Sequence, residues 1–141
     1  VVCDVWRTLP LKDSCATVLL DVFAPRNAGE FHRVLSSDGL LVMVTPTPAH
    51  LQEIVTAFRL LTVDPRKPER VGESLRGLFA PCAHTQLEEA LELNHTQVTA
   101  LVGMGPSSHH VTEQELSLRV AALPPVVQTT LSITLTVYRR I

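Results

Sequence analysis

Few residues of this sequence form a pattern that does chemistry by itself. Gly103, Gly105 and Pro106 occur as Gly-Met-Gly-Pro, which lacks the third glycine of a dinucleotide-binding loop and does not follow a buried strand. The neighbouring pair His109-His110 has no carboxylate or cysteine at a supporting spacing, so we interpret it as a solvated loop pair. Neither pattern predicts a nucleotide or metal site.

Other reactive side chains are equally unspecific. Ser107, His109 and Asp64 can be combined into a hydrolase triad, but many Ser, His and Asp residues are available for such a combination. Three glutamates are interpreted as a solvated face rather than a catalytic pair: Glu88, Glu89 and Glu92. The three cysteines are odd in number and form no Cys-x-x-Cys pattern, which argues against a disulfide framework or a four-cysteine zinc site: Cys3, Cys15 and Cys82.

Length and composition predict one globular domain. The chain has 141 residues, of which 45% are hydrophobic and 18% charged. The net charge of −2 offers no basic excess for a nucleic-acid surface. No apolar run approaches the roughly 18 residues of a membrane span, and no secretory signal opens the chain, so a cytoplasmic location is expected. The start at Val1, without Met and within a strand-like run, suggests a fragment of a longer protein.

Hydrophobic periodicity predicts alternating strands and helices. Strands are expected at Val1–Val5, Ala16–Phe23, Leu40–Val44, Gln86–Leu93 and Thr129–Tyr138. Helices are expected at Ala28–Leu35, Ala49–Leu61, Arg70–Leu78, Thr96–Met104 and Thr112–Leu123. This alternation is typical of an open α/β sheet.

Two of the expected strands differ in kind. Ala16–Phe23 is almost continuously apolar, as in a strand buried on both faces of a parallel sheet. Thr129–Tyr138 alternates apolar residues with Ser and Thr, which favours an antiparallel or edge strand.

Four segments carry a family resemblance. They are Asp21–Asn27 (DVFAPRN), Glu30–Leu35 (EFHRVL), Val44–Leu51 (VTPTPAHL) and Ala100–Ser107 (ALVGMGPS). They resemble the 23S rRNA (guanine-N1)-methyltransferases, S-adenosylmethionine-dependent enzymes that include the tylosin-resistance proteins of actinomycetes. The resemblance implies methylation of guanine N1 in 23S rRNA, with antibiotic resistance as one associated role. It also implies the second half of a Rossmann-like class I methyltransferase sheet, strands 3 to 7, mostly parallel with one antiparallel strand.

The resemblance assigns roles to single residues. Asp4 would approach the adenine amino group of S-adenosylmethionine, and His50 would touch the same cofactor. A guanine pocket would be lined by Phe23, Ala24 and Pro25, and bordered by Gly105, Pro106 and Ser107. Asp21 is the carboxylate nearest to that pocket in sequence and is the candidate general base. Simpler structural roles stay open: Asp4 could end a strand, His50 could begin a helix, and Phe23 could be core.

The chain also departs from the family pattern. The glycine-rich cofactor loop, the ribose-binding acid and the zinc-binding N-terminal domain would all precede Val1, so zinc is expected only there. We therefore expect residues 1–141 to be the C-terminal portion of the methyltransferase domain and to be inactive alone. The sheet edge at Ala16–Phe23 would be open, which could support a homodimer. Two alternatives remain: a methyltransferase acting on a small molecule, and a non-catalytic interaction or dimerisation fragment.

Overall fold

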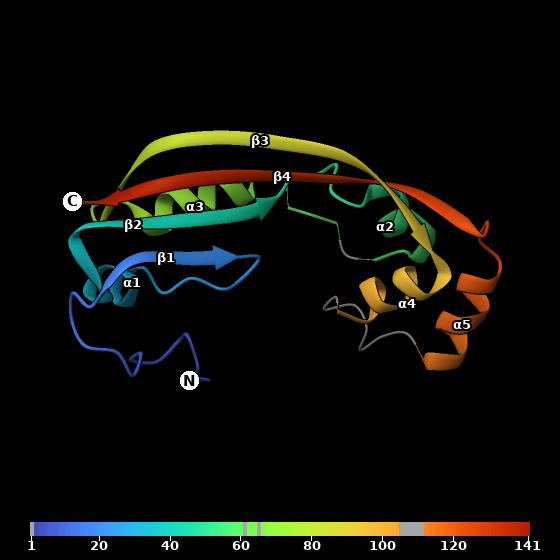
Figure 1. The fold of residues 1–141 in the computed structure, drawn as a ribbon, viewed down its shortest axis with the longest axis horizontal. Helices are drawn as coiled ribbons and strands as arrows, with labels where there is room; N and C mark the ends of the chain where they lie inside the picture. The colour runs from blue at the N-terminus through green and yellow to red at the C-terminus, as the bar shows by residue number, and fades with distance from the viewer. Residues whose placement is uncertain (1, 61, 65, 105–111) are drawn as a thin grey trace. The chain divides into compact units, whose positions relative to one another are not determined.

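The computed structural model describes residues 2–60, 62–64, 66–104 and 112–141. Two compact units are distinguished within it (Figure 1). The first unit comprises Val1–Thr47, Pro65–Leu87 and Ile133–Ile141, and the second comprises Pro48–Asp64 and Glu88–Ser132.

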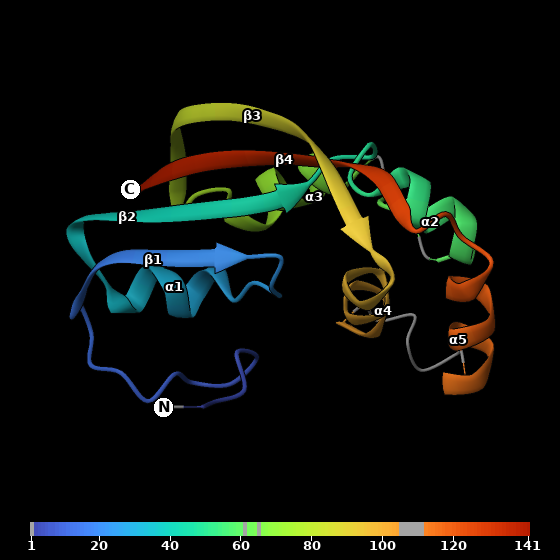
Figure 2. The ribbon, with the colours of Figure 1, turned by 45° about the vertical axis from the view of Figure 1, so that its right-hand side comes forward.

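The four described strands form one mixed sheet. They are β1 (Ala16–Val22), β2 (Leu35–Pro46), β3 (Phe79–Asn94) and β4 (Val126–Arg140), in the order β1-β2-β4-β3 (Figure 2). β1 and β2 are parallel, whereas β2 and β4 are antiparallel. Hydrogen bonds of side chains connect Cys82 of β3 with Val137 of β4, and Glu92 of β3 with Gln128 of β4. Residue numbers therefore rise along β3 as they fall along β4, so this pair is antiparallel too.

The sheet therefore confirms part of the expectation. An α/β fold with a four-stranded mixed sheet is present, whereas the expected set of strands 3 to 7 is not confirmed. The expectation of a mostly parallel sheet is not confirmed, because β4 lies between β2 and β3 and leaves one parallel pair. The prediction of a strand at Val1–Val5 is also wrong among the residues that the structure describes. Residues 2–4 have no regular structure, and a turn follows them.

Five helices are described, of which α1 and α3 belong to the first unit. α1 (Ala28–Val34) begins at Asn27, whose side chain accepts the Glu30 N–H, and α3 covers Lys67–Leu75. The second unit contains α2 (Gln52–Phe58), α4 (His95–Met104) and α5 (Glu113–Ala121). At α5, the Thr112 hydroxyl accepts the Glu115 N–H at 3.2 Å and so caps the start of the helix.

Each unit has its own apolar core. In the first unit α1, α3 and the strands bury ten residues: Leu9, Phe31, Val34, Leu35, Leu41, Met43, Val71, Leu75, Phe79 and Tyr138. In the second unit the three helices bury five: Ile54, Phe58, Val98, Val102 and Val120. The apolar residues that recur at helical spacing are thus buried by tertiary packing in both units.

β1 does not behave as a strand buried on both faces. Asp21 is only 3% exposed, whereas Val18, Leu20 and Val22 on the other face are 53%, 67% and 52% exposed. β1 is the last strand of the described sheet, and Leu19 and Ala16 are its residues that pack against the first unit's core. The pattern of apolar residues could not reveal which face has a covering layer.

Candidate functional site

The carboxyl end of β1 presents the residues expected to line a guanine pocket. Phe23 has a backbone φ of +52°, a left-handed conformation that is unfavourable for a bulky residue, and donates its N–H to Val44 O at 3.1 Å. Its side chain is 51% exposed, and Ala24 and Pro25 are exposed after it. Phe23 is therefore not a core residue, and the three side chains form one exposed turn beyond the strand.

Asp21 lies directly beneath this turn. Its Oδ1 accepts the Ala24 N–H at 3.2 Å, and the side chain is buried. A carboxylate that accepts a backbone N–H two to three residues ahead stabilises a tight turn. The geometry thus gives Asp21 a structural role in shaping the turn at Phe23.

Asp4 lies in an exposed turn of the first unit. Its Oδ1 accepts the Trp6 N–H at 3.0 Å, and its Oδ2 lies 3.5 Å from Arg7 Nε. Each carboxylate oxygen has two lone pairs, so Asp4 can still accept from a ligand amino group.

A charged network fixes the loop that follows Asp4. Arg33 of α1 bonds Glu30 with Nε at 2.8 Å and Nη2 at 2.7 Å, and Asp13 with Nη1 at 2.6 Å. The same guanidinium donates to the carbonyls of Leu11 at 2.8 Å and Leu9 at 3.0 Å. Glu30 also accepts the Leu9 N–H at 2.6 Å. We call Asp13, Glu30 and Arg33 the arginine hub; it attaches the segment Leu9–Asp13 to α1.

The hub sets the charge states of its members. The hydrogen bond from Arg33 is the main cause that lowers the pKa of Glu30 to about 2, followed by the Leu9 N–H. The Arg33 pKa is raised, chiefly by the hydrogen bond to Glu30. Sequence analysis missed the contact between Glu30 and Arg33. The signal was the i, i+3 spacing of opposite charges.

His50 belongs to the second unit. Its Nδ1 accepts the backbone N–H of Ser132 at 3.2 Å, and burial is the largest cause lowering its pKa. Ser132 is itself fully buried, and its hydroxyl donates to Glu88 Oε1 at 2.8 Å. α2 begins only at Gln52, after Leu51 in a left-handed conformation, so His50 precedes the helix rather than beginning it.

The first turn of α2 is bound to the same strand. The Leu51 N–H donates to Thr130 O at 2.7 Å. Glu53 accepts the Thr129 hydroxyl at 2.9 Å, the Thr130 N–H at 3.2 Å and the Thr130 hydroxyl at 3.3 Å. We call His50, Glu53, Thr129, Thr130 and Ser132 the histidine anchor. No local pattern indicates this anchor, since its halves are separated by about 80 positions.

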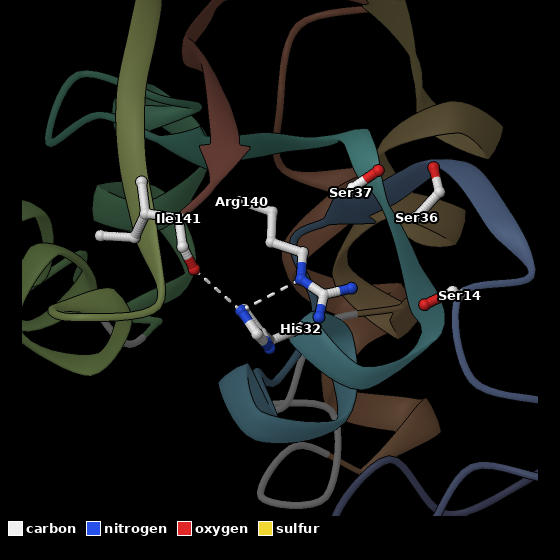
Figure 3. A pocket seen from close by; sticks show the side chains of 6 residues that line it. All are labelled: Ser14, His32, Ser36, Ser37, Arg140 and Ile141. Carbon is white, nitrogen blue, oxygen red and sulfur yellow. Dashed lines mark hydrogen bonds between the residues drawn. The ribbon is translucent and has the colours of Figure 1, made fainter.

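A hollow of about 480 Å³ lies at the other end of the first unit's sheet. It is lined by Ser14, His32, Ser36, Ser37, Arg140 and Ile141 (Figure 3). His32 Nε2 lies 3.1 Å from both Arg140 Nε and Ile141 O, and Arg140 Nη1 also bonds Leu35 O. Because α/β sheets bind ligands beyond the carboxyl ends of their parallel strands, this hollow at the start of β1 and β2 is not the expected cofactor site.

Several expectations receive no support or lie beyond the described residues. Gly105, Pro106 and Ser107 lie outside the described part of the chain, as does the pair His109-His110. Within that part, no group of three or more His, Cys, Asp and Glu side chains could hold a metal ion. Of the helices described, none is long and apolar enough to cross a membrane.

Comparison with curated proteins reveals close relatives. The chain is 45% identical over 138 residues to the 23S rRNA (guanine(748)-N(1))-methyltransferase of Streptomyces fradiae. It is 48% identical over 140 residues to a Micromonospora griseorubida protein named for the same guanine-N1 activity. The chain is therefore similar in sequence to 23S rRNA (guanine-N1)-methyltransferases. These alignments include 98–99% of this chain but 48–49% of the relatives, so it spans about half their length.

Solved structures show the same fold. A Bacillus halodurans C-125 protein named as a methyltransferase superposes with a TM-score of 0.57 at 14% identity, covering 97% of this chain and 69% of that one. The YcgJ protein of Bacillus subtilis gives a TM-score of 0.51 at 14% identity, covering 94% of this chain and 68% of that one. No protein-family model matches the chain. The methyltransferase-like α/β fold is thus established independently of the sequence similarity.

Proposed function

We propose that the protein containing this chain transfers a methyl group from S-adenosylmethionine to N1 of a guanine in 23S rRNA. The observation that carries the proposal is the 45–48% identity to guanine-N1 methyltransferases over almost the whole chain. The methyltransferase-like fold supports it. A bacterial rRNA substrate would place the protein in the cytoplasm.

The cofactor would be held in part by residues of this chain. When bound, S-adenosylmethionine supplies an electrophilic methyl group. Asp4 offers exposed carboxylate oxygens that can accept from the adenine amino group, and His50 offers a ring nitrogen. The donor and acceptor types therefore fit the cofactor, while the glycine-rich loop would come from another part of the protein.

Phe23, Ala24 and Pro25 would contact the guanine. Its N1 lies on the Watson–Crick edge, so the base must be unpaired or flipped out before transfer. An exposed aromatic ring in a strained turn is a suitable surface for stacking such a base. Gly105, Pro106 and Ser107 are proposed to border the same pocket, and Asp21 remains the candidate base, although its Oδ1 already accepts the Ala24 N–H.

We further propose that residues 1–141 form the C-terminal portion of the methyltransferase domain. Two facts support this: the chain spans about half the length of its relatives, and β1 exposes an apolar face of Val18, Leu20 and Val22. Zinc and most RNA contacts would then belong to an N-terminal domain. The 141-residue chain alone would not methylate.

The exposed face of β1 favours one second candidate. Contiguous apolar residues on an edge strand are typical of an interaction surface, so a homodimer could form there. The oligomeric state of the wild-type chain and of a Leu20→Lys variant separates the possibilities. Self-association of the wild type that Leu20→Lys abolishes supports the interaction fragment. A monomeric wild-type chain argues against the interaction fragment.

The decisive experiment uses the full-length protein, 23S rRNA and S-adenosylmethionine. Methylation of N1 blocks base pairing, so reverse transcription should stop next to the modified guanine. Phe23→Ala should raise KM for RNA and leave cofactor binding unchanged, while Leu118→Ala, on exposed surface of α5, serves as a matched control. Absence of a stop, together with methyl transfer to a small molecule, would overturn the rRNA assignment.

A further inference from the structure

The turn that carries Asp4 is joined to α1 through Val5. The Arg7 N–H donates to Asp4 O at 3.1 Å, and the Trp6 N–H donates to Asp4 Oδ1 at 3.0 Å, so residues 4–7 form a compact turn. The carbonyl of Val5, within this turn, accepts Nδ2 of Asn27 at 3.0 Å. Among the residues that the structure describes, this is the hydrogen bond that connects the turn to an element outside the segment 2–13.

Both ends of the Asn27 amide are used. Oδ1 accepts the Glu30 N–H at 3.3 Å and so caps the start of α1. A carboxamide has its acceptor on one atom and its donors on the other, so the cap fixes the orientation of the amide and leaves Nδ2 to donate to Val5 O. Val5 is partly buried against the first unit's core, where a carbonyl without a donor is unfavourable. The cap and the bond to Val5 are therefore two separable functions of one side chain.

The arginine hub does not replace this bond to Val5. The hub attaches the chain from Leu9 onward, whereas Asp4 lies several positions earlier. Residues 6–8, between the two attachments, are exposed. Without the Asn27 amide, the turn at Asp4 would be connected to the hub only through exposed chain.

Asn27 also lies two residues after the exposed turn of Phe23, Ala24 and Pro25. Its carbonyl accepts the Phe31 N–H at 2.9 Å, so its main chain is fixed to α1 as well. The backbone of Asn27 thus continues from the turn proposed to contact guanine, while its side chain holds the turn proposed to contact the cofactor.

We infer that Asn27 is a positioning residue for S-adenosylmethionine, because its Nδ2–H holds the turn of Asp4 against α1. The Asp4 carboxylate is thereby pre-organised to accept from the adenine amino group, and binding does not have to order a free turn, which would cost affinity. The identity of the ligand rests on the proposed function, whereas the attachment of the turn to α1 does not depend on it.

Asn27→Asp separates the bond to Val5 from the cap. Aspartate has nearly the same size and still accepts the Glu30 N–H, but at neutral pH it has no N–H to donate to Val5 O. In the full-length protein, the Kd for S-adenosylhomocysteine measured by calorimetry should weaken about tenfold, the worth of one hydrogen bond, while the thermal midpoint stays near that of the wild type. Without ligand, hydrogen exchange should accelerate at the amides of Trp6 and Arg7.

Two further variants control for charge and for the loss of a helix cap. Asn27→Ser is neutral, keeps an acceptor for the cap and is too short to reach Val5, so it should weaken the Kd as Asn27→Asp does. Thr112→Ala removes the cap of α5 and should lower the thermal midpoint without changing the Kd. In rRNA methylation, Asn27→Asp should raise the KM for S-adenosylmethionine and leave the KM for RNA and kcat unchanged, a selectivity that general destabilisation would not produce.

The outcomes distinguish this inference from the proposed function. A wild-type Kd in both Asn27→Asp and Asn27→Ser would overturn the inference and leave the methyltransferase proposal intact. A weaker Kd without faster exchange at Trp6 and Arg7 would also overturn it, because the effect would then not pass through the turn. Absence of S-adenosylhomocysteine binding and of rRNA methylation by the wild-type protein would instead refute the proposed function, and with it the cofactor role of Asn27.

Discussion

The arginine hub and the histidine anchor attach two segments that carry or adjoin predicted cofactor residues, and they do so by different chemistry. The hub uses one guanidinium and two carboxylates at a partly exposed place, and its members differ strongly in charge. In the anchor, Glu53 accepts from hydroxyls and a backbone N–H, His50 accepts from a backbone N–H, and several of the side chains are buried. Charge gives several bonds to one side chain in the hub, whereas burial lowers the pKa of His50 in the anchor.

We expect the largest effect from variants that remove one buried aromatic ring from the core of each unit. Phe31→Ala in α1 and Phe58→Ala in α2 should each cost about 3–5 kcal/mol of unfolding free energy, because both rings are buried. Urea unfolding measures the loss of unfolding free energy, and hydrogen exchange shows where amide protection is lost. Each variant should lose protection first in its own unit; uniform loss in both would show that the units unfold together.

Arg33→Lys should disrupt the hub more than a change of similar size elsewhere. Lysine keeps the charge but cannot bond Glu30 through two nitrogens while reaching the Leu9 and Leu11 carbonyls. Amide exchange of Leu9 should accelerate at least about tenfold, since its acceptor Glu30 loses its partner.

The matched control is Arg119→Lys. Arg119 also pairs with a glutamate, Glu115, and donates to the Phe58 carbonyl in the second unit. The Arg119→Lys variant should leave the rate of amide exchange at Leu9 unchanged. Equal acceleration in both variants would mean that the effect is not local to the hub.

Acid distinguishes the two attachments by their titrating groups. The folded pKa of Glu30 is about 2 against an ordinary 4.5, so its stabilisation is complete above pH 4.5 and is lost as pH falls toward 2. His50 has a lowered pKa, so its contribution falls earlier, as pH drops below the ordinary value of 6.5. Thermal midpoints measured from pH 8 to pH 2 should show both losses.

Variants assign the two steps. Glu30→Gln should reduce the decline below pH 4.5, to which Glu53 with its lowered pKa also contributes, and keep the earlier decline. His50→Gln should remove the earlier decline and keep the one below pH 4.5. A single decline that neither variant changes would contradict the assignment.

The smallest expected effect is in the histidine anchor. Thr129→Val removes one buried hydroxyl donor to Glu53 at nearly constant volume and should cost about 1 kcal/mol. The loss should be almost the same at low and high salt, measured by urea unfolding, because the donor is uncharged. A strong dependence on salt would mean that this bond depends on charge, as the bonds of the arginine hub do.

Sequence analysis was most accurate where the cause is local. The buried face of α1, with Phe31, Val34 and Leu35, follows from helical spacing, and the α5 cap follows from Thr112 and Glu115. The resemblance added the methyltransferase-like α/β fold, which periodicity alone could not supply.

Prediction failed where distant segments decide the outcome. The burial of β1 depends on what covers each face, which its own apolar residues do not encode. The histidine anchor joins residues about 80 positions apart, and no local pattern marks such a pair. The predicted roles of Asp4, Asp21 and Phe23 remain predictions, although the structure places Phe23 in an exposed turn rather than in the core.

The arginine hub also constrains how the sequence can change during evolution. One guanidinium contacts Leu9, Leu11, Asp13 and Glu30, so a single substitution at position 33 leaves four acceptors without their donor. An alternative arrangement requires simultaneous changes at positions 13, 30 and 33. Among homologues, these three positions should therefore vary together or not at all.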